Sequence, residues 1–373
     1  MKYKLKELAD ISSSKRIYYS EYTNKGIPFY RGKEIIEKTE NKDISNKLFI
    51  SKERYDELKI KYGVPQKGDI IMTAVGTLGK CWLVDSTEFY FKDGNCLWFY
   101  NFNRKINNKY LYYYMCSNFF QNKIDNICIG STQKALTIQQ LKEVNINIPC
   151  IETQNKIVKI LDNICHKIRI NSQTNDNLLE LIKKLYIEKI KNNNYINFEE
   201  KNLDEFCNIF TGKKNANASE ENGQYKFFTC APEPLSINSY IYDGPAVIVA
   251  GNGAYTGRTN FYNGKFDLYQ RTYGITTNND YIYLFYAMIY TDLQNDIMGG
   301  THGSAIPYIV MNDIAKFKVK YNKELFDELS QKIKVLLLKI KSNEAQNETL
   351  EQLRDTLLPK LMNGDIDLDK IEI

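Results

Sequence analysis

Two long segments of the chain repeat apolar residues at alternating spacings of three and four. This spacing is the a/d seam of a coiled coil, and it predicts one helix over residues 152–191 and another over 323–363. Two asparagines in the first seam have counterparts 172 positions later in the second. Asparagine there either fixes the register of packed helices or is tolerated polar surface, and both interpretations stay open. The seam positions are Leu161, Ile164, Ile168, Asn171, Asn175, Leu178, Ile182 and Leu185, then Ile333, Leu336, Ile340, Asn343, Asn347, Leu350, Arg354 and Leu357.

The sequence that precedes each long helix shows shorter apolar runs separated by turn residues. Such runs predict strands, whereas the aromatic-rich segments among them have the length of helices. Strands are expected at 70–74, 89–91, 97–100 and 247–250, and helices at 110–122 and 281–294. Each of these regions therefore mixes short strands with helices, and we predict the α+β class.

The chain is a duplication of one module. Residues 3–16 match 201–214 with a shift of 198 positions, so that Leu5 falls on Leu203, and Phe29 falls on Phe227 at the same shift. Farther on, 68–80 resembles 245–258, because both are an apolar run that enters a Gly-rich turn with a basic residue after its last Gly. Each module then ends on a second Gly-rich loop, at 130–136 and at 300–306. A repeat of this length is a duplicated domain with its helix rather than a solenoid.

The two modules differ mainly by one insertion. Phe29 and Ile70 are 41 positions apart, whereas their counterparts Phe227 and Val247 are 20 apart. From this layout we expect a first globular domain at 1–150, a first long helix at 151–195, a second globular domain at 196–322, and a second long helix with the C-terminal tail at 323–373.

Composition and charge narrow the possible functions. The chain has 43% hydrophobic and 25% charged residues, as globular proteins do. It has no apolar run long enough for a membrane span and no secretory signal, so we expect a cytoplasmic protein. Lys and Arg number 50 against 45 Asp and Glu, a weak indication of a polyanionic partner. None of the eight cysteines forms a C-x-x-C pair, which favours reduced thiols.

Motifs for catalysis are missing from the sequence. Only two histidines are present, His166 and His302, too few for a typical triad or a His-based metal centre. The glycines at 251, 253 and 257 do not have the spacing of a dinucleotide-binding loop, and the chain contains neither a Walker motif nor an Asn-Pro-Pro-aromatic segment. We therefore predict no catalytic residue, no metal site and no cofactor bound by this chain.

The positive signals are basic and amide side chains in loops. Arg and Lys neutralise phosphates or pair with guanine, Asn and Gln pair with adenine, and Gly lets the backbone approach the duplex. Any one such loop is usually only a solvated surface, and this holds for His302 too, but recurrence at matching places in two modules favours DNA binding. The candidate residues are Lys15, Arg16, Arg31, Lys33, Thr77, Lys80, Ser131, Thr132, Gln133 and Lys134 in the first module, and Lys213, Lys214, Asn252, Tyr255, Arg258, Arg271, Thr301, His302 and Ser304 in the second.

Taken together, the chain resembles the specificity subunit of type I restriction-modification enzymes along its whole length. The most specific match is the C-terminal segment 350–366, with Leu-Leu-Pro-Lys-Leu-Met at 357–362 and Gly-Asp-Ile at 364–366. The opening pattern at 5–15, the Gly-Ser-Thr-Gln-Lys loop at 130–134 and the Ile-x-Ile-Pro exit at 146–149 also fit. The second module departs from this pattern, with Gly-Thr-His-Gly-Ser at 300–304 and Val-Lys-Tyr at 319–321.

The resemblance implies a division of labour. The two globular domains would be target-recognition domains that each read one half of a bipartite double-stranded DNA site. The long helices would pack as an antiparallel coiled coil that holds the domains apart, with the two modules related by a pseudo-two-fold axis. Two methylation subunits of an adenine-specific DNA methyltransferase would dock on the chain and carry S-adenosylmethionine. Restriction and translocase subunits, with ATP and Mg, would join for defence against phage. Two other interpretations stay open: a protein-interaction scaffold that binds no DNA, and the specificity portion of a fused restriction-modification enzyme.

Overall fold

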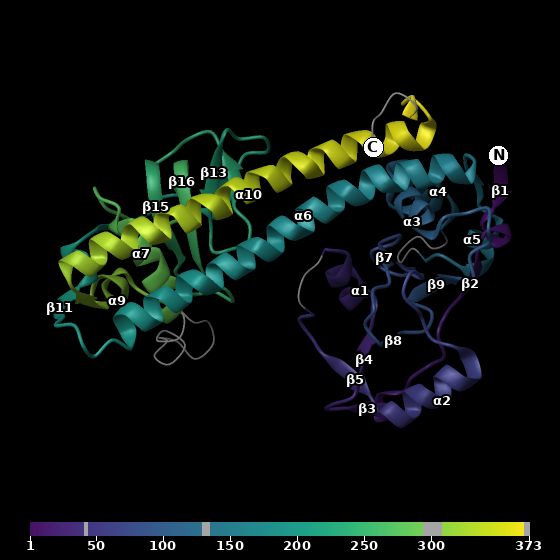
Figure 1. Ribbon diagram of the computed structural model, residues 1–373, viewed down its shortest axis with the longest axis horizontal. Helices are drawn as coiled ribbons and strands as arrows, with labels where there is room; N and C mark the ends of the chain where they lie inside the picture. Colours follow the sequence, from purple (N-terminus) through teal and green to yellow (C-terminus); the bar gives the residue numbers. More distant parts are fainter. Residues whose placement is uncertain (41–43, 129–134, 294–307, 369–373) are drawn as a thin grey trace. The chain divides into compact units, whose positions relative to one another are not determined.

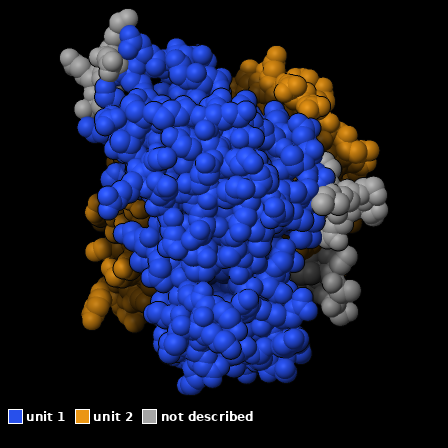
Figure 2. All heavy atoms as spheres, turned by 90° about the vertical axis from the view of Figure 1, so that its right-hand side faces the viewer, with its two compact units in different colours: residues 1–168, 348–373 blue, residues 169–347 orange. Residues whose placement is uncertain are grey.

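A computed structural model describes residues 1–40, 44–128, 135–293 and 308–368 (Figure 1). The chain divides into two compact units, one of residues 1–168 with 348–373 and one of residues 169–347. Each unit therefore contains one globular domain together with a stretch of both long helices. In Figure 2 the first unit, in blue, is a continuous body. In the part of the chain that the structure describes, no helix combines the length and the apolar character that crossing a membrane requires.

The two long helices predicted from the seam are confirmed. Helix α6 spans Ile151–Tyr186 and continues as a π-helical segment, η3, at Ile187–Lys191, while α10 spans Lys323–Asn363. Their seam positions are largely buried: Leu161 and Ile182 are fully buried in α6, as is Ile333 in α10. Within the second unit the helices run antiparallel, because Asn171 bonds to Asn347 and Asn175 bonds to Asn343. Within the first unit Leu161 and Leu358 belong to one apolar core, which agrees with the same direction.

The second domain is built on one six-stranded sheet with the order β12-β17-β15-β16-β13-β14. Its long central hairpin, β15 and β16, is antiparallel, whereas β13 lies parallel to the far end of β16. Helix α7, Tyr281–Met288, is buried along nearly its whole length and shares a core with Val247 and Val249 of β15. The strands are β12 Asn208–Thr211, β13 Tyr225–Phe228, β14 Leu235–Ile237, β15 Tyr242–Ala250, β16 Thr259–Leu268 and β17 Thr272–Thr276.

The first domain repeats this order with its sheet divided in two. One four-stranded sheet has the order β2-β9-β6-β7, and the other has β3-β5-β4-β8. Phe29 of β4 pairs in parallel with β8, as its counterpart Phe227 of β13 pairs with β16. The continuous strand β16 therefore corresponds to β7 and β8 together. The strands are β2 Asp10–Ser12, β3 Tyr22–Thr23, β4 Ile27–Tyr30, β5 Leu48–Ile50, β6 Ile70–Thr73, β7 Cys81–Leu83, β8 Tyr90–Phe91 and β9 Cys96–Tyr100.

The start and the end of each domain pair with each other. Strand β1, Lys2–Lys4, is antiparallel to β10, Asn145–Asn147, just before α6 begins. Strand β11, Glu199–Asn202, pairs in the same way with β18, Lys318–Tyr321, just before α10. This pairing closes each domain next to the first turn of a long helix, although Pro149 has no counterpart in the second module.

The insertion in the first module contains two helices. Helices α1, Gly32–Thr39, and α2, Lys52–Tyr62, flank β5 between β4 and β6. The expected single helix at 110–122 is wrong in one respect, because it is two helices, α3 Asn108–Cys116 and α4 Asn118–Ile127. Ser117 separates them in an extended conformation and caps α4 with its hydroxyl. The shorter elements are η1 Leu5–Glu7, η2 Tyr19–Glu21, α5 Ile138–Glu143, η4 Leu203–Glu205, η5 Ala216–Ala218, the π-helical η6 Ile289–Leu293, and α9 Met311–Ala315.

Candidate nucleic-acid interface

The Gly-rich turn of the first domain, residues 74–80, joins β6 to β7. The Thr73 backbone N–H donates to the Lys80 carbonyl at 2.9 Å, and the Gly79 N–H donates to the Thr73 carbonyl at 2.9 Å. The Thr73 hydroxyl also donates to the Thr77 carbonyl at 2.6 Å. Gly79 has a positive φ of 72°, which an L side chain rarely adopts. Main-chain bonds thus hold the turn, and the candidate side chains of Thr77 and Lys80 are exposed.

The Gly-rich turn of the second domain, residues 251–258, joins β15 to β16 in the same way. The Ala250 N–H donates to the Arg258 carbonyl at 2.9 Å, and the Gly257 N–H donates to the Ala250 carbonyl at 2.8 Å. Arg258 thus occupies the place that Lys80 has in the first domain. Its guanidinium lies 5.8 Å from the centroid of the Tyr255 ring, which is about half-exposed.

Each Gly-rich turn also contacts the segment that follows the second Gly-rich loop. The Leu136 N–H donates to the Ala74 carbonyl at 2.9 Å, and the Ile309 N–H donates to the Gly251 carbonyl at 2.9 Å. Asn252 forms an isolated antiparallel bridge with Tyr308, as Val75 does with Ala135. Two segments about 60 residues apart are therefore joined identically in both domains. The loop candidates Ser131, Thr132, Gln133, Lys134, Thr301, His302 and Ser304 lie outside the described residues.

Arg271 belongs to the same neighbourhood of the second domain. Its carbonyl accepts a hydrogen bond of 2.8 Å from the Gly251 N–H, and its side chain is exposed. In the first domain the Ala74 N–H donates to the Asn95 carbonyl at 2.8 Å, which is the matching bond. The structure thus brings Asn252, Tyr255, Arg258 and Arg271 together around one turn.

Two candidates follow β2 on the first domain. The side chain of Lys15 is exposed, and its Nζ lies 4.8 Å from the centroid of the Tyr62 ring at the end of α2. The Lys15 backbone N–H donates to the Tyr90 hydroxyl at 2.8 Å, which fixes the chain at this point. Arg16 is exposed and pairs with Asp93 at 3.0 Å. Both cations can therefore reach a ligand in solvent.

Arg31 is engaged within its own domain. Its Nε donates to Oε2 of Glu34 at 3.1 Å, its Nη2 donates to Oε1 at 2.7 Å, and its backbone N–H donates to Oε2 at 2.8 Å. Glu34 is completely buried. Burial by itself raises the pKa of the Glu34 carboxyl, but the bonds from Arg31 outweigh it, and the pKa is lowered overall. Lys33, two residues on from Arg31, is exposed and lies 3.8 Å from Glu37.

Lys214 is similarly engaged in the second domain. Its Nζ lies 3.1 Å from the buried carboxylate of Asp267 and also bonds to the Ser239 hydroxyl. The Ser239 hydroxyl in turn donates to Asp267 at 2.7 Å. Lys213 is exposed. Of these two neighbouring candidates, Lys214 is the one whose charge lies beside a buried carboxylate, whereas Lys213 presents its charge to solvent.

The asparagines of the helix seam form a polar layer in the second unit. Nδ2 of Asn343 donates to Oδ1 of Asn175 at 2.8 Å, and Nδ2 of Asn171 donates to Oδ1 of Asn347 at 2.9 Å and to Gln346 at 2.8 Å. Asn171, Asn175 and Asn343 are buried. Each buried amide here has a hydrogen-bond partner on the other helix, so a shift of register would leave it without one. This favours the interpretation that these asparagines fix the register over the interpretation that they are tolerated polar surface.

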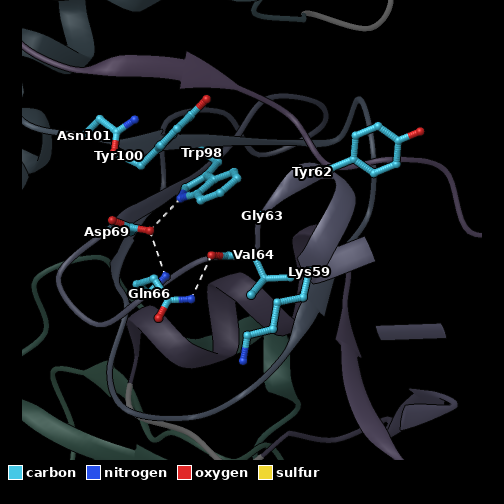
Figure 3. A pocket seen from close by; sticks show the side chains of 9 residues that line it. All are labelled: Lys59, Tyr62, Gly63, Val64, Gln66, Asp69, Trp98, Tyr100 and Asn101. Atoms are coloured by element: carbon cyan, nitrogen blue, oxygen red, sulfur yellow. Dashed lines mark hydrogen bonds between the residues drawn. The ribbon is translucent and has the colours of Figure 1, made fainter. Parts of the chain in front are cut away.

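A pocket that the sequence did not reveal lies beside the insertion in the first domain (Figure 3). It has a volume of about 500 Å³, and its lining includes Tyr62 at the end of α2 together with Asp69, Trp98 and Tyr100. The Trp98 and Tyr100 rings are stacked with centroids 4.1 Å apart. Residues two apart on a strand share a face, but which face would be hollowed, and that α2 would end beside it, could not be read from the spacing.

Several thiols are unsuited to nucleophilic chemistry. Burial raises the pKa of Cys96 and of Cys207 to about 12, so both remain protonated thiols near neutral pH. Burial also raises the pKa of Cys81. His166 is exposed on α6, away from both Gly-rich turns in the sequence.

Comparison with known proteins gives one consistent family. The type I restriction modification DNA specificity domain matches residues 1–180 and 195–353. The chain is 37% identical over 172 residues to the type I restriction enzyme EcoDI specificity subunit of Escherichia coli. The aligned region covers 44% of this chain and 37% of that protein. It is 25% identical over 304 residues to the type I restriction enzyme MjaIX specificity subunit of Methanocaldococcus jannaschii, covering 70% of each. The chain thus spans well under half of the first relative.

A solved structure has a similar fold. The crystal structure of the type I restriction-modification system S subunit from M. genitalium superposes on this chain with a TM-score of 0.59 and 18% sequence identity. The superposition covers 97% of this chain and 95% of that chain. At this identity the likeness concerns the fold alone. It agrees with the predicted class of two α+β domains in tandem with two long helices.

Proposed function

The chain belongs to the type I restriction-modification DNA specificity family, and from this premise we propose that it is the subunit that reads a bipartite DNA site. Each globular domain binds one half-site, and the antiparallel helices set the distance between the two. The two domains have different loops and only one has the insertion, so the half-sites differ in sequence. The subunit acts in the cytoplasm, on double-stranded DNA.

The observation that carries this proposal is the duplicated Gly-rich turn. In both domains the turn is held by the same set of main-chain bonds and ends on a cation, Lys80 in one and Arg258 in the other. A pre-ordered turn presents a cation without the entropic cost of ordering it on binding. Arg pairs with guanine through two hydrogen bonds, while Lys binds guanine or a phosphate.

Catalysis belongs to partner subunits in this proposal. Two methylation subunits dock on the chain and carry S-adenosylmethionine, and restriction subunits bring ATP and Mg. The chain itself binds no cofactor and has no catalytic residue. Purified alone, it is expected neither to methylate nor to cut DNA, and methyl transfer from a labelled donor by the lone chain would contradict this role.

The proposal is tested by sequencing methylated sites in cells that carry the complete system. Lys80→Ala should alter or weaken recognition of one half-site and Arg258→Ala that of the other, each by about 1–3 kcal/mol where the contact is to a base. Exposed lysines outside the turns supply matched controls, Lys67→Ala for the first domain and Lys226→Ala for the second.

Exchange of residues 1–150 for the same domain of another specificity subunit provides a second test. Only one half of the methylated motif should change. A change in both halves would refute the modular reading of DNA, and equal effects of the turn and control variants would refute the role of the turns. The chain should shift random duplex DNA in a gel, and the shift should weaken as salt is raised; no shift even at low salt would favour a scaffold that binds no DNA.

A further inference from the structure

The pocket beside α2 has the form of a site for a flat ring. Helix α2 ends at Tyr62, and Gly63 turns the chain directly over the indole of Trp98, where an added Cβ would lie 3.5 Å from the ring. Trp98 is almost buried and is backed by Tyr100, while Tyr62 is about half-exposed. The volume of about 500 Å³ lies within the range of small-molecule sites and accommodates a nucleotide.

One acceptor in this pocket is left over. Oδ2 of the buried Asp69 accepts two hydrogen bonds, one from the Trp98 indole N–H at 2.8 Å and one from the Gln66 backbone N–H at 2.8 Å. Among the residues that the structure describes, none donates a hydrogen bond to Oδ1 of Asp69. Figure 3 shows the bonded oxygen of Asp69 facing the indole nitrogen and the other oxygen turned to the opposite side, where a donor of a bound ring can reach it. A carboxylate oxygen accepts the exocyclic amino group of a nucleobase, as in the pairing of Asp with cytosine N4.

The rim of the pocket is cationic. Lys59 lines it and lies 3.9 Å from Glu88. Lys15 and Lys61 do not line the pocket, but their ammonium groups lie 4.8 and 5.3 Å from the centroid of the Tyr62 ring, which does. All three lysines are exposed. A phosphate attached to a base in the pocket would therefore find positive charge at the entrance, while an aromatic ring next to it offers a stacking partner.

The second domain does not have this set of residues. At the matching register positions it carries Ala246 in place of Asp69, Gly274 in place of Trp98, and Thr276 in place of Tyr100. The ring of Phe210 there lies against Gly274, about 2.7 Å from where a Cβ would be. The aromatic and acidic pocket is therefore a property of the first domain and not of the repeated architecture.

We propose that this pocket binds one unpaired nucleobase that carries an exocyclic amino group, with its phosphate at the lysine rim. Thymine is disfavoured, because its ring N–H lies between two carbonyl oxygens, and these are repelled by the negative charge of the Asp69 carboxylate. The base comes either from a free mononucleotide or from an unstacked position of DNA. The DNA source rests on the function proposed above, whereas the mononucleotide source does not.

The test uses the fluorescence of Trp98 in the full chain. The chain contains two tryptophans, and Trp82→Phe leaves Trp98 as the reporter. We titrate dCMP and dTMP, and separately a duplex with one unpaired cytosine or thymine beside the fully paired duplex. Cytosine ligands should quench Trp98 at a concentration roughly tenfold below that needed for thymine ligands, a ratio typical of one hydrogen-bonded base contact.

Two variants make the test specific. Asp69→Asn retains an oxygen for the Trp98 and Gln66 bonds but turns the free acceptor into a donor, so the preference should shift from cytosine towards thymine. Tyr62→Ala removes a ring that is about half-exposed, and it should weaken binding roughly tenfold if that ring stacks on the base. Tyr18→Ala is the matched control, because Tyr18 is more exposed than Tyr62 and does not line the pocket.

The outcomes separate this inference from the proposed function. A response to dCMP identifies the free nucleotide as a ligand, and a response only to the unpaired duplex identifies DNA as the source. If neither ligand changes Trp98 fluorescence while the complete system still methylates its site, the pocket proposal is wrong and the proposed function stands. If mononucleotides bind but the complete system recognises no DNA, the pocket stands and the proposed function is wrong.

Discussion

Replacing Arg31 by Ala separates a structural role from a DNA-reading role. From the sequence Arg31 is a candidate base contact, but in the structure its guanidinium makes two hydrogen bonds to Glu34, at 2.7 and 3.1 Å. The Arg31 side chain is 37% exposed, whereas that of Glu34 is 0% exposed. The substitution therefore leaves a buried carboxylate with backbone donors only.

The magnitude follows from that geometry. Removing one partner of a buried ion pair typically costs about 3–5 kcal/mol. Here the Arg31 backbone N–H still donates to Glu34, and water reaches the partly exposed Arg31 site. We therefore expect the free energy of unfolding of the first unit to fall by roughly 2–3 kcal/mol, below the fully buried case.

Both tryptophans, Trp82 and Trp98, lie in the first domain, so their fluorescence during urea unfolding reports on the first unit. A local probe is needed because a chain of two units need not unfold in one step. Arg16→Ala is the control: Arg16 pairs with Asp93 at an exposed site, and its loss should cost at most about 1 kcal/mol. Glu34→Gln removes the buried charge. In that background Arg31→Ala should lower the free energy of unfolding much less than it does in the wild type, and a double-mutant cycle measures the difference.

The pH dependence has a definite sign. The pKa of Glu34 is lowered in the folded protein, so the stability from this pair is present above the ordinary carboxyl pKa of 4.5 and is lost as the pH falls through the lowered value. In the Arg31→Ala variant the lowering of the Glu34 pKa by the guanidinium is lost, whereas the burial that raises this pKa remains. The difference between variant and wild type should therefore be largest near neutral pH and shrink in acid. Unchanged stability together with a changed base in the methylated motif would refute the structural role.

Three further predictions concern the helix pair and the first Gly-rich turn. Replacing Asn175 and Asn343 together by Leu should leave the stability of the second unit unchanged or raise it by about 1 kcal/mol while loosening register, measured by urea unfolding and size-exclusion chromatography; a large loss of stability would contradict this. Gly79→Ala should lower the free energy of unfolding by roughly 1–3 kcal/mol, because φ is 72° and the new Cβ would lie 2.4 Å from Ile124. Gly94→Ala is the control in the same unfolding assay: its φ is 70° but no atom lies within 4 Å of the new Cβ, so the loss should be about 1 kcal/mol. A four-residue insertion between 172 and 176 adds one helical turn, ~6 Å, and should lengthen the gap between half-sites by about one to two base pairs with some loss of affinity; an unchanged gap with full activity would show that partner subunits position the domains.

Several features followed from the sequence because local spacing encodes them. The seams of α6 and α10 have a period that only packed helices satisfy, and both helices are present. The matches between the modules predicted two domains of one class, and both have the same strand order, β2-β9-β6-β7 and β12-β17-β15-β16. The excess length between Phe29 and Ile70 likewise predicted the insertion. The predictions of single DNA contacts remain predictions.

Tertiary structure decided which of the chemically similar residues are available. Arg16 and Arg31 look alike in a sequence, but Arg31 bonds a buried glutamate, whereas Arg16 is exposed beside Asp93. In the same way Lys214 lies against the buried Asp267 and its neighbour Lys213 is exposed. No local signal distinguishes Lys213 from Lys214, since Asp267 reaches Lys214 only because its strand lies beside that position.

The same holds for contacts between distant segments. The Gly-rich turns meet the chain after the second loops, about 60 residues on, through backbone bonds that no side-chain pattern marks. The pocket combines the end of an inserted helix with a strand 36 positions later, from Tyr62 to Trp98. The sequence by itself determined the elements and their duplication, because periodicity is a local property. Only the packed structure determined the site, because its geometry depends on which distant segments become neighbours.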